Sequence, residues 1–284
     1  MINNSTCKLR RITTMQQTTN IFYPDSGADN SLIRYIWQIN KSDCGVEKEI
    51  ILPKGTAEII FNLSEKTLCF NDSENASVNL YRCIINGLNT IPHCLIKNES
   101  QLFIGIQLHS FALKYLFGIP NKEFTNQVLD GFALCNSLEN LFDELASAVH
   151  FERRVALILK WFKEKIECNN RQSDKSMIFD LYYNADIEKQ SVKSISKAYN
   201  LSDRHLRRLS NDYLGMNTED FILYRKYLKS LLQLHDTKKS LTEVAYLSDY
   251  YDQPHFIREF KAFTGLTPGE YRKNMSGLPG HLFF

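Results

Sequence analysis

The chain has 284 residues, of which 43% are hydrophobic and 12% aromatic, so it is long enough for about two domains and too apolar to be disordered throughout. Its formal net charge of +2 singles out no class of partner, and its seven cysteines include no C-x-x-C pair, which excludes the usual zinc and redox motifs. The N-terminal residues lack the apolar core of a signal peptide, and no apolar run approaches the roughly 18–20 residues of a membrane helix. We therefore expect a soluble, cytoplasmic protein with reduced thiols.

The texture of the chain changes at His109. Residues 1–20 are polar and are expected to be a flexible arm. Up to His109, runs rich in β-branched and aromatic residues, such as "SLIRYIWQI", "AEIIFNLS" and "QLFIGIQLH", alternate with turn signals, which predicts a sandwich or small barrel. After His109, "SLENLFDELASAV" and "FERRVALILKWFKEKIE" repeat apolar residues every three to four positions, as amphipathic helices do.

The polar stretch "CNNRQSDKS" predicts a domain boundary. We expect a first domain over residues 21–168, a linker over 169–176, an all-helical domain over 177–275 and a tail over 276–284. The fold class is therefore α+β. Residues 191–274 contain 14 lysines and arginines against 10 aspartates and glutamates, a net charge of +4, which hints at a polyanionic partner for the helical domain.

Two segments of the helical domain repeat one pattern, over residues 191–215 and 240–265. Each consists of a short helix, a tight turn and a second helix. Ser202 and Asp252 are the expected N-caps of the two second helices, and each of these helices is followed by a glycine that suits the left-handed position after a helix. The pattern predicts two helix-turn-helix units, at about 192–213 and 240–263, whose second helices enter DNA major grooves.

A single predicted helix, "TEDFILYRKYLKSLLQLHD" over residues 218–236, separates the two units. Its 19 residues span about 28 Å at ~1.5 Å per residue. Successive major-groove faces lie ~34 Å apart. With the widths of the flanking units added, this helix can hold two readers one DNA turn apart.

The faces of the two second helices separate core positions from DNA-facing positions. Phe256, Phe260 and Phe263 form an inward stripe in the second unit, and Leu206, Leu209 and Tyr213 point inward in the first. Arginine pairs with guanine and glutamine with adenine at base edges. The candidate DNA-binding residues are Arg204, Arg207, Arg208, Asn211, Tyr251, Gln253, Pro254, Arg258 and Lys261.

The stretch "EVAYLSDYYDQPHFIREFKAFTGLTPGEYR" resembles the C-terminal signature of the AraC/XylS transcription regulators, and the resemblance covers residues 174–274. It implies a sequence-specific DNA-binding regulator that is not an enzyme, with double-stranded DNA and RNA polymerase as partners. Three positions depart from the family pattern: Ser196 replaces a small alanine, Ser210 an aromatic core residue, and Asp249 the turn glycine. The loss of a ring at Ser210 puts the rigidity of the first unit in question.

The N-terminal stretches "YIWQINKSD" and "LPKGTAEIIFNL" resemble the cupin-like sensor domains of some members of this family. The resemblance implies a β-barrel that binds a small-molecule effector or forms a homodimer. Such pockets are mostly apolar, so Trp37, Phe61, Tyr81 and Phe103 are candidate ligand-binding residues, although each on its own also suits an ordinary barrel core. Lys54 and Glu58, beside a turn, are expected to be solvent-exposed.

Metal catalysis is not expected, because His93 and His109 are isolated and the chain has no His-x-His motif. No metal or other cofactor is therefore predicted. Two alternatives stay open: a cupin-type metal oxygenase with a DNA-binding tail, and an interaction protein whose degraded first helix-turn-helix unit no longer binds DNA.

Overall fold

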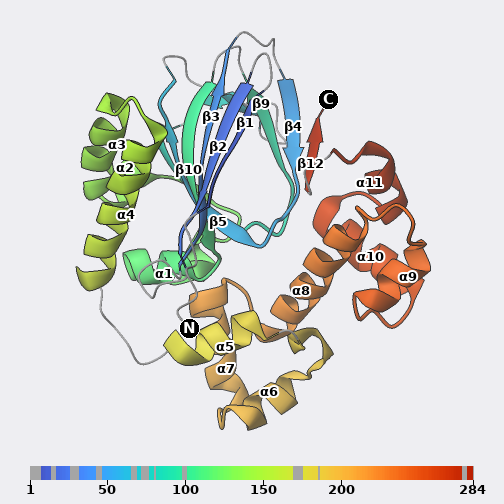
Figure 1. Ribbon diagram of the computed structural model, residues 1–284. Helices are drawn as coiled ribbons and strands as arrows, with labels where there is room; N and C mark the ends of the chain where they lie inside the picture. The colour runs from blue at the N-terminus through green and yellow to red at the C-terminus, as the bar shows by residue number, and fades with distance from the viewer. Residues whose placement is uncertain are drawn as a thin grey trace, which may run out of the picture.

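The computed structural model describes residues 8–13, 17–25, 32–42, 47–64, 69–71, 77–79, 81–97, 101–168, 175–184, 186–276 and 280–283. Its strands form two antiparallel sheets (Figure 1). The first has the order β1 (Lys8–Thr13), β2 (Gln17–Tyr23), β3 (Ile33–Lys41), β10 (Gln101–His109), β5 (Thr56–Asn62), β8 (Cys83–Asn86), β11 (Val128–Asp130). The second has the order β12 (His281–Phe283), β4 (Glu47–Ile51), β9 (His93–Lys97), β6 (Cys69–Asn71), β7 (Ser77–Asn79).

Strand β10 lies at the centre of the first sheet, and its side chains are buried on both faces of that sheet. Ile104, Ile106 and Leu108 alternate with Phe103, Gly105 and Gln107, and all six are buried. Gly105 pairs with Trp37, whose ring lies over it so closely that an added Cβ would be 2.2 Å from the ring. This glycine therefore lets a large ring lie flat on the sheet.

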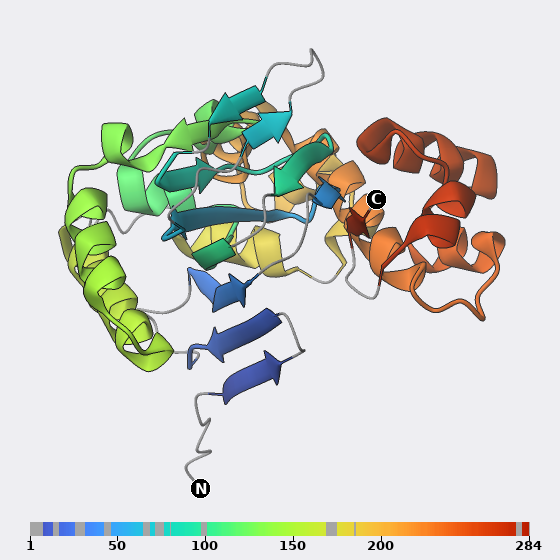
Figure 2. The same ribbon diagram turned by 90° about the horizontal axis from the view of Figure 1, so that it is seen from above.

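Five helical segments follow β10: α1 (Ala112–Phe117), the 3-10 helix η2 (Asn121–Phe124), α2 (Gly131–Leu134), α3 (Ser137–Ser147) and α4 (Phe151–Cys168). Helices α2, α3 and α4 stand together beside the sheets in Figures 1 and 2. Phe142 of α3 packs against Phe61 of β5, with their ring centroids 6.5 Å apart. The Phe61 face of the first sheet therefore packs against these helices.

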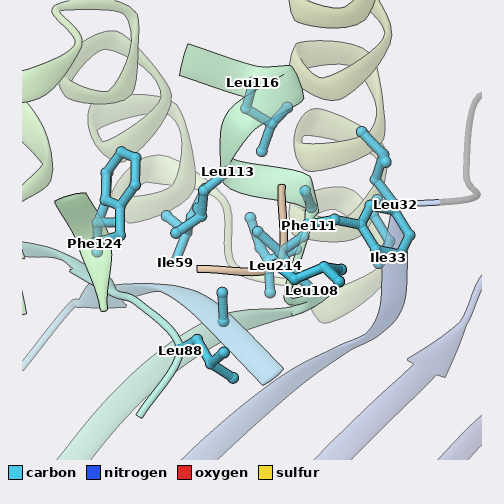
Figure 3. Close-up of a cluster of buried hydrophobic side chains, with 14 of the residues drawn as sticks. Leu32, Ile33, Ile59, Leu88, Leu108, Phe111, Leu113, Leu116, Phe124 and Leu214 are labelled. Carbon is cyan, nitrogen blue, oxygen red and sulfur yellow. The ribbon is translucent and has the colours of Figure 1, made fainter. Parts of the chain in front are cut away.

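The C-terminal part is helical: α5 (Lys175–Tyr183), η3 (Ile187–Lys189), α6 (Val192–Ala198), α7 (Asp203–Leu214), α8 (Thr218–Gln233), α9 (Leu241–Leu247), α10 (Gln253–Thr264) and α11 (Pro268–Asn274). Helix α8 was expected to reach residue 236, and it ends three residues earlier. Figure 3 shows Leu214, the last residue of α7, among side chains of the N-terminal part such as Phe111, Leu108 and Ile59. One hydrophobic core therefore runs through both parts of the chain.

Two expectations about the chain ends need correction. Residues 8–13 and 17–23, within and beside the expected flexible arm, are the strands β1 and β2, paired from Lys8↔Tyr23 to Thr13↔Thr18. Strand β2 continues the sheet through β3, so its polar residues are fixed by backbone pairing rather than by burial. The expected tail contains β12, which pairs with β4, a strand more than 200 residues earlier in the sequence. Residues 169–174 of the expected linker lie outside the described residues, and α5 begins at Lys175.

Candidate nucleic-acid interface

The second reader, defined here as α9 and α10, has the local structure that its sequence predicts. The Asp252 carboxylate accepts a hydrogen bond from the backbone N–H of His255, Pro254 lies in the first turn of α10, and Gly265 ends the helix in a left-handed conformation. Phe256 and Phe260 are fully buried. Phe263 stacks on Tyr227 of α8 with 4.8 Å between the ring centroids. The reader is thus held by an aromatic core that it shares with α8.

The opposite face of the second reader is open to solvent. Arg258, Lys261 and Pro254 are exposed, and Gln253 is half-buried. Tyr251 is 91% exposed, which leaves an aromatic ring almost wholly in water at the start of α10. The Arg258 guanidinium is 3.4 Å from the Glu259 carboxylate, but an exposed pair of this kind contributes little and leaves the arginine free to turn to another anion.

The turn of the second reader is fastened by α8. Asp249 replaces the glycine expected there and adopts φ +60°, a conformation that costs most residues about 1 kcal/mol or more. Lys229 Nζ lies 2.6 Å from the Asp249 carboxylate, and Lys226 Nζ donates to the Asp249 carbonyl at 2.7 Å. The aspartate therefore gains two lysine contacts, one of which involves its own side chain.

The first reader, defined here as α6 and α7, has a similar outline and a different core. The Ser202 hydroxyl accepts from the N–H of His205, which confirms the expected N-cap, and Leu206 and Leu209 are buried. Ser210 is fully buried as expected, and its hydroxyl lies 2.7 Å from that of Thr218. A buried pair of hydroxyls therefore occupies the place of the family's aromatic ring. The Ser196 hydroxyl is likewise satisfied, because it donates to the Leu201 carbonyl.

The outer face of α7 carries the predicted arginines. Arg204, Arg207 and Arg208 are exposed, and Asn211 is half-buried with its amide donating to the Arg207 carbonyl. Arg207 lies 3.9 Å from Glu219 and Arg208 lies 3.6 Å from Asp212. Both guanidinium groups are largely in solvent, so these pairs hold them only weakly.

The N-terminal part grips the far end of α7. Asn121 of η2 donates from Nδ2 to the Tyr213 carbonyl at 2.5 Å, and the Thr125 hydroxyl donates to the Gly215 carbonyl at 2.9 Å. These are carbonyls at the end of a helix, where partners within the helix are missing. Tyr213 also packs against Tyr115 of α1, with ring centroids 5.4 Å apart. The first reader is therefore braced from outside.

Two buried tyrosines attach α8 to the same part of the molecule. The Tyr224 hydroxyl accepts from the Gly55 N–H at 3.0 Å and donates to the Asn89 carbonyl at 2.7 Å. The Tyr227 hydroxyl donates to the Pro53 carbonyl at 2.9 Å. Burial raises the pKa of both tyrosines, so the hydroxyls stay protonated and can keep donating.

The comparisons with known proteins agree with this geometry. A family model described as "Helix-turn-helix domain" matches residues 195–274, and one described as "Domain of unknown function (DUF6597)" matches residues 30–130. The probable transcription factor PqrA of Proteus vulgaris is 23% identical over 126 residues, which are 44% of this chain and 88% of that protein. The HTH-type transcriptional activator AarP of Providencia stuartii is 25% identical over 87 residues, 31% of this chain and 64% of that protein. The C-terminal part is an AraC-type helix-turn-helix domain.

With this domain, the chain is a DNA-binding transcription regulator. Among solved structures, ToxT from Vibrio cholerae aligns with 92% of this chain and 100% of that chain, at 13% identity. The TM-score of 0.46 is too low for that likeness to assign a fold or a ligand.

The four candidate ligand-binding rings of the AraC-type regulator lie in three different places. Trp37 and Phe103 pack together with Ile60, Ile84 and Val128 on one face of the first sheet. Phe61 points from the opposite face toward α3, and Tyr81 is 40% exposed at the surface. The structure therefore brings together two of the four.

A polar group on the Trp37 face was missed by sequence reasoning. Glu58 is buried, which corrects the expectation that it is exposed, and one of its carboxylate oxygens accepts from Gln107 Nε2 at 3.0 Å. Gln107 also donates to the Thr56 hydroxyl. Glu58 pairs with Gln107 across β5 and β10, so the odd-numbered face of β10 carries both this polar group and Phe103. The alternation of side chains along β5 predicts that Glu58 and Ile60 lie on the same face of the sheet. It does not predict that this face is buried.

His109, one of the two isolated histidines, is packed among aromatic side chains. His109 stacks on Phe111 and lies 3.0 Å from the Tyr183 hydroxyl of α5; its burial, with Arg34 nearby, lowers its pKa to about 4. Within the described ranges no cluster of three or more His, Cys, Asp or Glu side chains is arranged to hold a metal ion. In the same residues no helix has the length and apolarity to cross a bilayer.

Proposed function

We propose that this AraC-type regulator reads two successive major grooves of one DNA duplex, with α7 in the first and α10 in the second. The observation that carries the proposal is the division of faces. The candidate side chains of both helices lie on open faces, while the buried faces and helix ends contact α8 or the N-terminal part. Bound DNA would then meet both readers without displacing any of these contacts.

Helix α8 sets the spacing in this proposal. Its 16 residues span about 24 Å at ~1.5 Å per residue, and each reader extends beyond one of its ends. Two half-sites should therefore lie one helical turn apart, about 10 base pairs centre to centre. Base-edge contacts are assigned to Arg204, Arg207, Arg208, Gln253 and Arg258, and phosphate contact to Lys261.

The test is a binding experiment with the whole chain. Duplexes are first selected from a random-sequence pool, and their affinity is then measured as a function of salt. We expect two half-sites and a steep fall of affinity with salt, because phosphate contacts release counterions. Inserting about five base pairs between the half-sites turns one of them to the opposite side of the duplex and should abolish high affinity. Full affinity after that insertion would show that the readers do not act together.

We further propose that the N-terminal part controls the regulator by binding a small molecule at the Trp37–Phe103 face. Both rings offer apolar contact, and the buried Glu58 carboxylate would accept a hydrogen bond from the ligand. Tyr35 adds a hydroxyl whose pKa is raised by burial and by Glu58, so it stays a donor. This narrows the four candidate rings to two, and leaves Phe61 and Tyr81 to other roles.

The effector proposal is tested with Trp161→Phe, which leaves Trp37 as the single tryptophan. Small aromatic amines and their matching hydrocarbons are titrated while Trp37 fluorescence is followed. Binding of amines that is lost in Glu58→Gln, with no binding of the hydrocarbons, would support the proposal. If the amines changed Trp37 fluorescence equally with and without Glu58→Gln, Glu58 would play no part in ligand binding. RNA polymerase and a second copy of the chain are the further partners that the family resemblance supports.

A further inference from the structure

The last described residues of the chain form part of the N-terminal domain. Strand β12 pairs with β4 in the register His281↔Ile51, Leu282↔Ile50 and Phe283↔Glu49, and in Figure 1 it lies between β4 and α11. The Leu282 side chain is completely buried and belongs to the common hydrophobic core. The chain thus returns from the second reader to a sheet formed by its first hundred residues.

The backbone of Gly280 forms a hydrogen bond with each of the two parts of the chain. Its N–H donates to the Tyr271 hydroxyl of α11 at 3.1 Å, and its carbonyl accepts from the Leu52 N–H at 2.8 Å. It adopts φ +79°, and a Cβ at this position would lie 3.2 Å from Lys54 Cγ. A left-handed conformation in such a close contact favours glycine.

Charged groups add to this backbone pairing. Glu49 of β4 is almost fully buried, and its carboxylate contacts Nδ1 of His281. Lys54 Nζ lies 3.3 Å from Nε2 of the same imidazole. Strand pairing, a buried leucine and a histidine between two charged residues of the N-terminal domain therefore all fix the same four residues.

We propose that residues 280–283 are a latch that couples the second reader to the N-terminal domain, and that the latched chain is the form that binds DNA. This rests on the proposed function. The latch lies on the sheet edge and α11, while the reading faces of α7 and α10 are open, so the latch need not be released for DNA to bind. Holding two readers in one arrangement reduces the entropy lost when both engage one duplex.

Coupling of this kind is reciprocal. If the latch raises the affinity for DNA, bound DNA must hold the latch closed by the same factor. An inhibitory latch would have the opposite signature, because DNA binding would open it. Protection of the β4 amides therefore reports the sign of the coupling.

The first arm of the test needs no DNA. Hydrogen exchange of residues 47–52 is measured in the whole chain and in Leu282→Asp, which places a charge at a buried position. Leu9→Asp, the same change at an exposed leucine of β1, is the matched control. We expect protection of 47–52 to fall in Leu282→Asp alone. Unchanged protection would show that β12 does not dock in solution. Gly280→Ala, which adds strain without charge, should give a smaller loss in the same direction.

The second arm uses the duplex selected with the unaltered chain. We expect the duplex to increase protection of residues 47–52, and Leu282→Asp to weaken its binding by at least about fivefold, the lower end of usual coupling between sites. The salt dependence should stay the same, because no phosphate contact is removed. Equal or tighter binding by Leu282→Asp would overturn the proposal. Failure of the unaltered chain to bind any duplex would instead refute the proposed function, and the exchange comparison would still decide whether the latch docks.

Discussion

The two readers have the same outline and obtain their rigidity from different sources. The second has a continuous aromatic core, in which Phe256, Phe260 and Phe263 pack on Tyr227 and Tyr250. The first has a hydroxyl pair, Ser210 and Thr218, at the corresponding inward position. Its missing ring is compensated at the end of α7, where the N-terminal domain supplies hydrogen bonds and the Tyr115 ring.

This difference indicates which reader can respond to the N-terminal domain. A unit with a continuous aromatic core depends less on its neighbours for its shape. A unit whose helix end is completed by another domain changes stability whenever that domain moves. A change in the N-terminal domain would therefore act on the stability of the first reader directly, whereas the proposed latch links that domain to the second reader through α11.

The largest effect is expected from Phe260→Ala in the second reader. Phe260 is fully buried among Tyr227, Phe256 and Tyr271, so truncation should cost about 3–5 kcal/mol of unfolding free energy. Urea denaturation of the whole chain measures the loss. Ala262→Gly, at an exposed position of the same helix, is the control and should cost no more than about 1 kcal/mol. Equal losses for the two variants would mean that this aromatic core does not stabilise the reader.

Asn121→Ala tests whether the N-terminal domain stabilises the first reader more than the second. Asn121 is buried in the N-terminal domain and donates to the Ser110 and Tyr213 carbonyls, so its loss leaves acceptors unsatisfied and should cost about 1–3 kcal/mol. Hydrogen exchange should rise in α7 and stay unchanged in α10. Equal increases in both helices would show that the readers are braced as one body and that the contrast drawn here is wrong.

The sequence predicts the parts of each reader that depend on neighbours in the chain. The caps at Ser202 and Asp252, the glycines after both helices and the burial of Phe256 and Phe260 all follow from spacing and are confirmed, while Phe263 is half-buried. The tolerance of Asp249 for a left-handed turn was also expected. Its contacts with Lys226 and Lys229 were not, because nothing in a sequence tells that both lysines of α8 face this turn.

Contacts between distant residues account for what the sequence could not predict. Asn121 and Tyr213 are 92 residues apart, and Glu49 and His281 are 232 apart. The ligand candidates failed to converge for a different reason. Phe61 and Ile60 are adjacent and both apolar, so either could face the helices, and a shift of one residue exchanges the two faces of a strand.

Reading by the second unit is tested with Arg258→Ala and Lys261→Ala. Arg258 lies on the open face of α10, so its loss should cost roughly 1–3 kcal/mol on the selected duplex and relax the preference at one base position. Lys261 lies one turn later, toward the end of the helix. Its loss should weaken all sequences equally and reduce the salt slope by about one. Salt titrations on selected and scrambled duplexes distinguish the two. If Arg258→Ala lost affinity equally on both, Arg258 would be a phosphate contact.

The turn of the second reader allows a smaller test. Asp249→Ala keeps the left-handed backbone, loses the Lys229 ion pair and should cost about 1–2 kcal/mol. Asp249→Gly loses the same ion pair but relieves the backbone, so its unfolding free energy should stay closer to that of the unaltered chain. Thermal unfolding of both variants provides the measurement. A glycine variant less stable than the alanine variant would show that the backbone conformation at residue 249 carries no strain.

The smallest effect concerns Thr242, a residue that no sequence pattern indicates. Its hydroxyl donates to Oε1 of Gln253 at 2.6 Å, from the first helix of the reader to the second. With one lone pair of that oxygen in use and the amide oriented by Thr242, the Gln253 NH2 group is the end more readily offered to DNA. An adenine contact needs both ends of the amide, whereas guanine and thymine present acceptors that an NH2 group alone can reach. Thr242 should therefore bias Gln253 away from adenine.

Base preference at the position read by Gln253 decides this point. Thr242→Val removes the hydroxyl at nearly constant volume, frees Oε1 and should shift the preference toward adenine, with a change in affinity of less than about 1 kcal/mol on the selected duplex. Thr242→Ser retains the donor and should keep the original preference. Gln253→Ala is the necessary reference, because it must flatten the preference if Gln253 reads a base at all. If the valine and serine variants prefer the same base while Gln253→Ala does flatten the preference, Gln253 reads DNA without guidance from Thr242. The orientation of its amide is then set by the DNA rather than by the protein.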